Sequence, residues 1–475
     1  MKKFYSLALS LSVAAIASAE TFTTPNTGST YTLNSLSQIE GSNLTQKEGK
    51  TYLLSDTLTI SANDKLQLLA GDVLEIANKV VVTVYGEAIF NPETTAYIKR
   101  ASDDAEPTGF AFYGKTTLKN INYEGGNIQY FGSDPLIVDK CDFHDVNNAK
   151  SNYGVIVVGG GQSKGNKITN CSFTDCKPGA VNSPANLGVG ILFENNVITN
   201  VSTLNLLCPY VNLAASATDS VIIRNNTLNG AKLVKPGGIG VSNMLNTAGK
   251  NIVVVSGNLV QNCSWGLNFV GGMDVTISDN VIKDNRWDTD DNGGIAVTMY
   301  SLPSYPLTVY AHDNTFEGNK WGPCNVGGSI ANYGKTETDD NGKANPGNNI
   351  FKNNQHEVSA TGQTVKCDFC NNSTVTAYAQ NNYWGSAANA SEAAQYIGDK
   401  NSDPRYGTVI YEPVKDASGV KAVMPDFDNT FEGNVELYRL DGVKVFSGEA
   451  SRISEAGEGI YIICQGNKTR KIIIK

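Results

Sequence analysis

The stretch VIIRNNTLNG, residues 221–230, sets β-branched residues directly before a pair of asparagines. Val and Ile favour strands, whereas Asn favours tight turns. Similar stretches occur at ILFENNVITN (191–200), IVVVSGNLVQN (252–262) and VTISDNVIKDN (275–285). This recurrence predicts short strands that end repeatedly at asparagine corners.

The repeat can be aligned on a small polar residue that stands two positions before an apolar one. It recurs at steps of 22 to 35 residues, and a second small polar residue follows each copy. Periods of this length indicate a repeat architecture in which each unit is stabilised by stacking on its neighbour. The aligned residues are Cys141, Cys171, Asn196, Asn226, Asn258, Asn280, Asn314 and Asn349.

The repeats lack the long apolar periodicity of helical repeats and consist of short strand-forming runs, which predicts an all-β chain. A coil of parallel strands, one turn per repeat, would stack Asn above Asn and let their amides hydrogen-bond along the stack. The apolar residue two positions later would point inward, and Cys141 and Cys171 would form a short thiol ladder. A β-sandwich with Asn-rich turns is the alternative, but eight copies of one core pattern favour the solenoid.

Two further segments carry a family resemblance. TYLLSDTLTISANDKLQLLAGDVLEI (51–76) and the closing NNYWG (381–385), which precedes a short helix, an Asp and a Tyr-x-Pro, are similar to segments of the right-handed parallel β-helix superfamily. The chain resembles the pectate-lyase-like folds of that superfamily, and more closely its exported Bacteroidetes members, from about Thr30 to Pro413. The resemblance implies a right-handed parallel β-helix.

The first residues resemble a secretory signal peptide, with Lys2 and Lys3 before an apolar run and Ala-Ser-Ala at 17–19. No later run has the length of a transmembrane segment. A formal net charge of −9 argues against nucleic acid as a partner. We therefore expect a signal peptide over 1–19, a β-helix over 20–415 and an exported protein that is secreted or displayed at the cell surface, associated with the outer membrane.

Residues 416–475 form the third predicted region, a linker and a small β-sandwich-like domain with a turn at Asp441-Gly442. The segments ELYRLDGVKVF (436–446), GIYII (459–463) and TRKIIIK (469–475) resemble the C-terminal sorting domain of type IX secretion cargo. The resemblance implies the type IX secretion machinery as a partner. A cap that shields the end of the solenoid is the alternative.

One charged segment, RWDTDDNGG (286–294), suggests chemistry. Asp288, Asp290 and Asn292 alternate like the first half of a calcium loop, although Met299 stands where the bidentate Glu belongs, and a solvated turn is the simpler interpretation. A uronate lyase would need calcium, or a basic residue, beside the substrate carboxylate and a base for the α-proton; Arg286 and His312 are the catalytic candidates. The hallmarks of polygalacturonases are absent.

Aromatic residues suggest a binding surface, because their faces stack on sugar rings. Trp265, Trp287 and Trp321 each follow a repeat, so they would line one side of the stack, and Tyr300 and Tyr305 lie nearby. The cysteines add little: Cys367-Asp-Phe-Cys370 has the spacing of half a zinc site but no second pair near it in the sequence. A surface protein that binds extracellular polysaccharide, or acts as an adhesin, is the leading hypothesis. A polysaccharide lyase comes second and a structural surface protein third.

Overall fold

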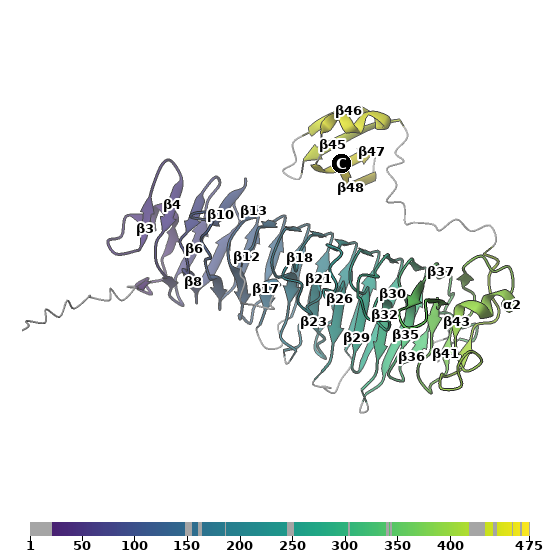
Figure 1. The fold of residues 1–475 in the computed structure, drawn as a ribbon. Coiled ribbons are helices and arrows are strands. Elements are labelled where there is room, and N and C mark those ends of the chain that lie inside the picture. The colour runs from purple at the N-terminus through teal and green to yellow at the C-terminus, as the bar shows by residue number, and fades with distance from the viewer. Residues whose placement is uncertain are drawn as a thin grey trace, which may run out of the picture.

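The computed structural model describes residues 21–147, 154–159, 164–185, 187–244, 251–302, 305–338, 342, 344–417, 433–439, 444–457, 459–465 and 468–474. The signal peptide prediction and the Asp441-Gly442 turn lie outside these residues. The chain from Phe22 to Ile410 winds into a parallel β-helix whose three long sheets run along the stack (Figure 1). The predicted all-β solenoid is confirmed.

Each coil contributes one strand to each sheet, in the order C, A, B. Sheet A consists of β1 (Phe22–Thr23), β5 (Leu58–Ile60), β8 (Val81–Val84), β11 (Gly109–Phe112), β14 (Asn127–Tyr130), β17 (Gly154–Val158), β20 (Gly179–Asn182), β23 (Val211–Ala214), β26 (Ile239–Ser242), β29 (Leu267–Val270), β32 (Ile295–Tyr300), β35 (Trp321–Asn325), β40 (Phe369–Cys370) and β43 (Ile397–Gly398).

Sheet B follows sheet A in every coil. It consists of β2 (Thr30–Thr32), β6 (Lys65–Leu68), β9 (Glu87–Phe90), β12 (Thr116–Lys119), β15 (Ile137–Asp139), β18 (Asn166–Thr169), β21 (Ile191–Glu194), β24 (Val221–Arg224), β27 (Ile252–Ser256), β30 (Met273–Ser278), β33 (Leu307–His312), β36 (Ile330–Asn332), β41 (Ala377–Tyr378) and β44 (Val409–Ile410).

Sheet C completes the coil, and only its first pair, β3 with β4, is antiparallel. It consists of β3 (Leu44–Gln46), β4 (Thr51–Leu54), β7 (Val73–Ile76), β10 (Ala96–Arg100), β13 (Ile121–Tyr123), β16 (Asp142–His144), β19 (Ser172–Thr174), β22 (Val197–Thr199), β25 (Thr227–Asn229), β28 (Leu259–Gln261), β31 (Val281–Lys283), β34 (Thr315–Glu317), β37 (Ile350–Lys352) and β42 (Tyr383–Trp384).

The inside of the coil is one continuous hydrophobic core. Side chains of a strand alternate between its two faces, so every second residue points inward. The apolar residue two positions after each aligned repeat residue is buried, as predicted, and in several coils it stacks on its counterpart. Phe143 and Phe173 have ring centroids 4.9 Å apart, and Phe351 lies 4.4 Å from Trp384.

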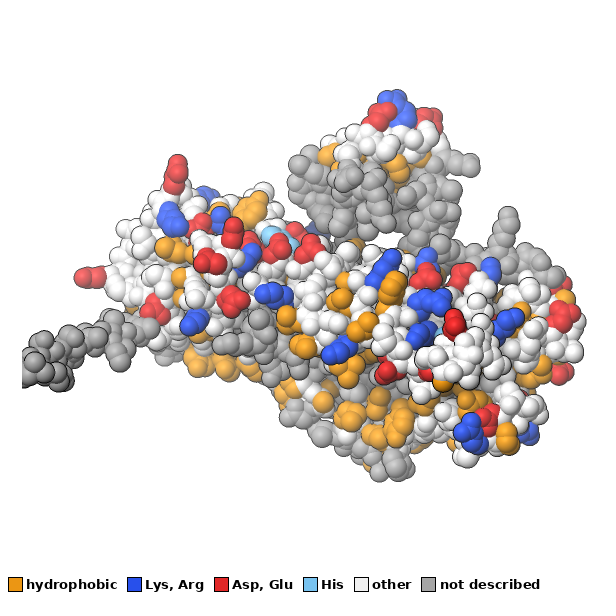
Figure 2. All heavy atoms as spheres, viewed as in Figure 1, with side chains coloured by type: hydrophobic (Ala, Val, Ile, Leu, Met, Phe, Trp, Pro, Cys, Tyr) orange, Lys and Arg blue, Asp and Glu red, His pale blue; other side chains and the backbone are white. Residues whose placement is uncertain are grey.

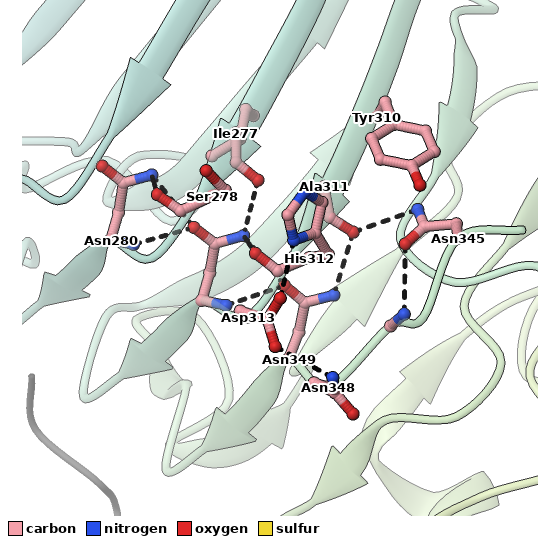
Figure 3. A network of polar contacts seen from close by, with 12 residues as sticks. Ile277, Ser278, Asn280, Tyr310, Ala311, His312, Asp313, Asn345, Asn348 and Asn349 are labelled. Atoms are coloured by element: carbon pink, nitrogen blue, oxygen red, sulfur yellow. Dashed lines mark hydrogen bonds and ion pairs between the residues drawn. The ribbon is translucent and has the colours of Figure 1, made fainter. Parts of the chain in front are cut away.

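The corner between sheets B and C explains the asparagine pairs. The first residue of each pair takes a left-handed backbone, which Asn and Gly tolerate best; Asn225, for example, has φ 56° and is exposed. The second residue is buried, and its Nδ2 donates to Oδ1 of the next coil at 2.9–3.0 Å (Figure 3). This predicted ladder runs through Asn196, Asn226, Asn258, Asn280, Asn314, Asn349 and Asn382.

A second, shorter ladder runs where sheet C ends. Asn285 donates to Asn319 at 3.1 Å, Asn319 to Asn354 at 2.8 Å, and Asn354 to the carboxylate of Asp368 at 2.7 Å. The thiols of Cys141 and Cys171 stack at the B–C corner ahead of the first ladder, and the predicted thiol ladder is therefore present.

Short helices close the core at both ends. Leu33 and Leu36 of α1 (Leu33–Ser37) join the core at the first coils, and Ala393 of α2 (Ala390–Ala393) joins it at the last. The 3-10 helix η1 (Ala394–Tyr396) follows α2, after the NYWG motif as expected. Within the described ranges, no helix has both the length and the apolar character needed to cross a bilayer.

The tail forms a separate antiparallel sheet in the order β46 (Lys444–Glu449), β45 (Asn434–Arg439), β47 (Gly459–Gln465) and β48 (Lys468–Ile474). Its hydrophobic cluster includes Val435, Leu437 and Ile463, and the 3-10 helix η2 (Ala450–Ala456) packs against it. The described residues of the tail contain one sheet, and η2 packs against it where a β-sandwich would have a second sheet. The tail thus has a hydrophobic core of its own.

Candidate functional site

The corner between sheets C and A carries a shallow polar groove near the C-terminal end of the solenoid. Its open volume is about 440 Å³. Three successive coils line it, after β31, β34 and β37, with Lys283, Asp284, Arg286, Glu317, Gly318, Asn353 and Gln355. Figure 2 shows charged side chains of both signs on the surface of the solenoid, including its C-terminal half. The groove therefore offers cations, carboxylates and amides to one ligand.

The register of the strands explains how the charged side chains meet. Lys283 and Glu317 are Cα partners at the ends of β31 and β34. The backbone then turns at Asp284, which has φ 55°, and the chain leaves the sheet toward Arg286. A guanidinium nitrogen of Arg286 donates to the carbonyl oxygen of Gln355 at 3.3 Å, which ties two coils together across the groove.

A hairpin beside the groove holds the loop that contains the acidic segment. It consists of β38 (Gln355–Val358) and β39 (Gln363–Lys366). The hydroxyl of Ser359 donates to a carboxylate oxygen of Asp291 at 2.6 Å. Hydrogen bonding from Ser359 holds the pKa of Asp291 below its usual value. The ring of His356 lies 4.4 Å from the ring of Trp321, and burial lowers the pKa of this histidine.

The three predicted tryptophans all lie at the C–A corner, in successive coils, but they differ in what they can contact. Trp287 follows Arg286 directly, is 36% exposed and has the ammonium of Lys232 5.3 Å from its ring centroid. Trp321 is partly buried and donates to the carbonyl oxygen of Asp291 at 2.8 Å. The ring of Trp265 covers Gly237 so closely that a Cβ there would lie 1.9 Å from it. Trp287 is the most exposed of the three and follows the groove residue Arg286 in the chain, while its ring faces Lys232, which lies two coils earlier.

The two predicted tyrosines lie on the other side of sheet A, at the A–B corner. Tyr300 ends β32 and is 44% exposed, and Tyr305 follows it in the loop and is 37% exposed. Sheet A therefore separates both from the groove. Their proximity to Arg286 in the sequence does not carry over into the fold, because six residues of strand lie between the two corners.

The two predicted catalytic residues also lie at different corners. His312 ends β33 in sheet B, where its Nδ1 lies 2.7 Å from the carboxylate of Asp313 (Figure 3). Arg286 lies at the C–A corner. The structure therefore does not bring this cation and this imidazole together as one catalytic pair.

The acidic residues predicted to bind calcium form a turn. A carboxylate oxygen of Asp288 accepts from the backbone N–H of Asp290 at 2.9 Å, and Lys320 donates to the carbonyl oxygen of Asp290 at 3.1 Å. Asn292 follows in the same turn. Over the described ranges of the chain, no group of three or more His, Cys, Asp and Glu side chains is arranged to hold a metal ion. The segment therefore has the hydrogen bonds of a turn, and calcium binding to it stays a prediction.

Sequence reasoning missed the groove residues Lys283 and Glu317, although the repeat contains the signal for them. Each lies three positions after an aligned asparagine, Asn280 or Asn314, and therefore at the same outward-facing place in its coil. It also missed an exposed stack at the ends of three early sheet A strands. The rings of Tyr85 and Tyr113 are 4.9 Å apart, and those of Tyr113 and Phe131 are 5.1 Å apart.

Comparison of the chain with protein-family models, with curated proteins and with solved structures found no match. The functional inference therefore starts from the side chains at the C–A corner.

Proposed function

We propose that the protein is exported to the cell surface and binds extracellular polysaccharide in the groove at the C–A corner. The observation that carries this proposal is a groove lined by Lys283, Arg286 and Glu317, with the exposed Trp287 next to Arg286 in the chain. A tryptophan face stacks on the C–H face of a sugar, and the polar side chains offer hydrogen bonds to hydroxyl groups. The lining of the groove comes from three successive coils, so several sugars of a linear chain could contact it.

The charges in the groove favour a polysaccharide that carries carboxylates. The chain has a formal net charge of −9, which repels polyanions at long range. Within the groove, Lys283 and Arg286 place two cations beside the carboxylates of Asp284 and Glu317, and Arg pairs with carboxylates through a planar fork of donors. We therefore expect uronate-containing polysaccharides to be held more strongly than neutral ones, and to be released by salt.

The test is retention of the purified mature protein on affinity gels that contain uronate or neutral polysaccharides. Trp287→Ala should weaken retention about tenfold, because an aromatic stacking contact contributes about 0.5–1.5 kcal/mol beyond its buried area. Tyr300→Ala is the matched control, since it removes another exposed ring on the far side of sheet A. Equal losses for both variants would move the binding site away from the groove, and wild-type protein that is retained on no gel would favour a purely structural surface protein.

A uronate lyase is the second candidate, because Arg286 and Lys283 lie together where a substrate carboxylate would bind. Elimination needs a cation at that carboxylate and a base at the α-carbon, for which the groove offers Lys283. If the groove only binds, wild-type protein incubated with uronate polysaccharides, with and without calcium, will form no unsaturated product. An ultraviolet-absorbing product that disappears in Lys283→Ala would establish the lyase instead.

Export by the type IX system remains part of this proposal. The three tail segments that resemble a sorting domain fall on the four strands of one folded sheet, and Val435, Leu437 and Ile463 give that sheet its own core. A folded terminal module of this kind is what a secretion machine could recognise. The signal-like residues 1–19 would direct the first step of export.

A further inference from the structure

Three cysteines that are separated in the sequence meet on the outer face of sheet A. Cys324 on β35 and Cys370 on β40 are Cα partners in neighbouring coils, and Cys367 lies three residues before Cys370 in the same coil. All three are free thiols with at most 5% of their surface exposed. They form a cluster of their own, outside the core of the solenoid, against which Ile295, Trp321, Val326 and Tyr406 pack.

The sulfur atoms converge on one point. A Cβ placed on Gly398 in the next coil would lie 3.2 Å from Sγ of Cys367 and 3.4 Å from Sγ of Cys370. The side chains of Cys324 and Cys367 both hydrogen-bond to Cys370. In-register neighbours in a parallel sheet lie about 4.8 Å apart, which falls within the Cα separation of about 4.4–6.8 Å that a disulfide requires.

The three thiols differ in acidity, and their geometry explains why. Hydrogen bonds from Cys324, Cys367 and the hydroxyl of Tyr406 stabilise a thiolate at Cys370 and lower the pKa of that thiol. The same contacts raise the pKa values of Cys324 and Cys367, together with burial. By contrast, burial is the main cause that raises the pKa of Cys176, elsewhere in the solenoid, to about 12. A thiolate is the attacking form in disulfide exchange.

We propose that Cys370 is the central sulfur of a thiol–disulfide site and forms a disulfide with either Cys324 or Cys367. The oxidant is a small-molecule disulfide. Sγ of Cys370 attacks one of its sulfurs, forms a mixed disulfide and displaces a thiolate. Cys324 or Cys367 then gives up its proton and attacks Sγ of Cys370, which releases the second thiolate. The oxidant is reduced to two thiols, and the two protons of the cysteines end on them.

The two possible disulfides have different consequences for the fold. A bond between Cys324 and Cys370 would join neighbouring coils covalently, whereas a bond between Cys367 and Cys370 would close a short loop within one coil. Cys370 takes part in both disulfides. The thiol that one disulfide leaves free can therefore attack Cys370 and form the other disulfide. Trp321 packs against the cluster and reaches the loop of Asp291, so the site adjoins the groove without contributing to it.

The test is to refold the protein in a glutathione redox buffer, which gives the oxidant access, and to map disulfides by mass spectrometry of tryptic peptides. Wild type should contain one disulfide that includes Cys370. Cys324→Ser and Cys367→Ser should each retain a disulfide, formed with the remaining partner. Cys370→Ser and the double variant Cys324→Ser/Cys367→Ser should have none in this cluster.

Cys176→Ser is the matched control, because it removes a buried thiol outside the cluster and should leave the disulfide unchanged. A bond between Cys324 and Cys367 in Cys370→Ser would show that Cys370 is not central. Wild type that refolds to its usual circular dichroism spectrum with all three thiols reduced would overturn the proposal.

Discussion

Replacing Asn226 by alanine should destabilise the β-helix by about 3–5 kcal/mol, because it leaves several buried polar groups without partners. Oδ1 of Asn226 accepts from the backbone N–H and from Nδ2 of Asn196, at 2.9 and 3.0 Å. Its Nδ2 donates to the carbonyl oxygen of Phe193 at 2.9 Å and to Oδ1 of Asn258 at 2.9 Å. Alanine can replace none of these bonds, and the side chain is only 1% exposed.

Asn225 provides a matched control one residue away. Its left-handed backbone (φ 56°) is exposed to solvent, and glycine adopts that conformation without strain. Asn225→Gly should therefore change the free energy of unfolding by no more than about 1 kcal/mol. Urea denaturation followed by circular dichroism measures both variants. Similar losses in the two would mean that the corner, and not the buried ladder, supplies the stabilisation.

The repeat pattern predicted the ladder because stacked coils place equivalent positions above one another. The same logic applies to Asn382, which continues the ladder and precedes Trp384 by two residues, as the pattern requires. The sequence pattern is weak in this coil, because its strands in sheets A and B, β40 and β41, have only two residues each. Local pattern therefore determined most of the core and the corners of this fold.

The groove and the thiol cluster depend on information that a local pattern lacks. Arg286 and His312 are close in the sequence, yet the strands β32 and β33 lie between them and carry the chain across two sheets. Cys324 and Cys370 are partners in neighbouring coils, but the hairpin β38–β39 lies between them in the sequence. The hairpin makes the sequence distance between these two partners longer than the usual repeat. Predicting such contacts requires the length of every excursion.

Asp368 occupies the last rung of the second ladder, where an asparagine would fit. Its Oδ1 accepts from the backbone N–H and from Nδ2 of Asn354, at 2.9 and 2.7 Å, while Oδ2 has no partner among the described residues. Burial raises the pKa of this carboxyl from 3.8 to about 7, more than the hydrogen bonds from Asn354 lower it. Ionisation is therefore unfavourable in the folded protein.

The raised pKa of Asp368 makes stability depend on pH. Between the pKa of the unfolded chain and that of the folded state, the folded protein binds more protons, so stability falls as the pH rises toward about 7. Asp368→Asn removes this loss. The variant should be more stable than wild type by on the order of 2–4 kcal/mol at about pH 8, and nearly equal to it at about pH 4.

Urea unfolding of wild type and Asp368→Asn at these two pH values measures the effect of the buried carboxyl. Asp403→Asn is the control, because Asp403 is only partly buried and hydrogen bonds from Arg405 lower its pKa to about 2, the opposite direction. That variant should gain no stability at high pH. If Asp368→Asn were less stable than wild type at both pH values, the carboxylate would instead be held by a cation or a second donor at Oδ2, since only such a partner makes a buried charge favourable.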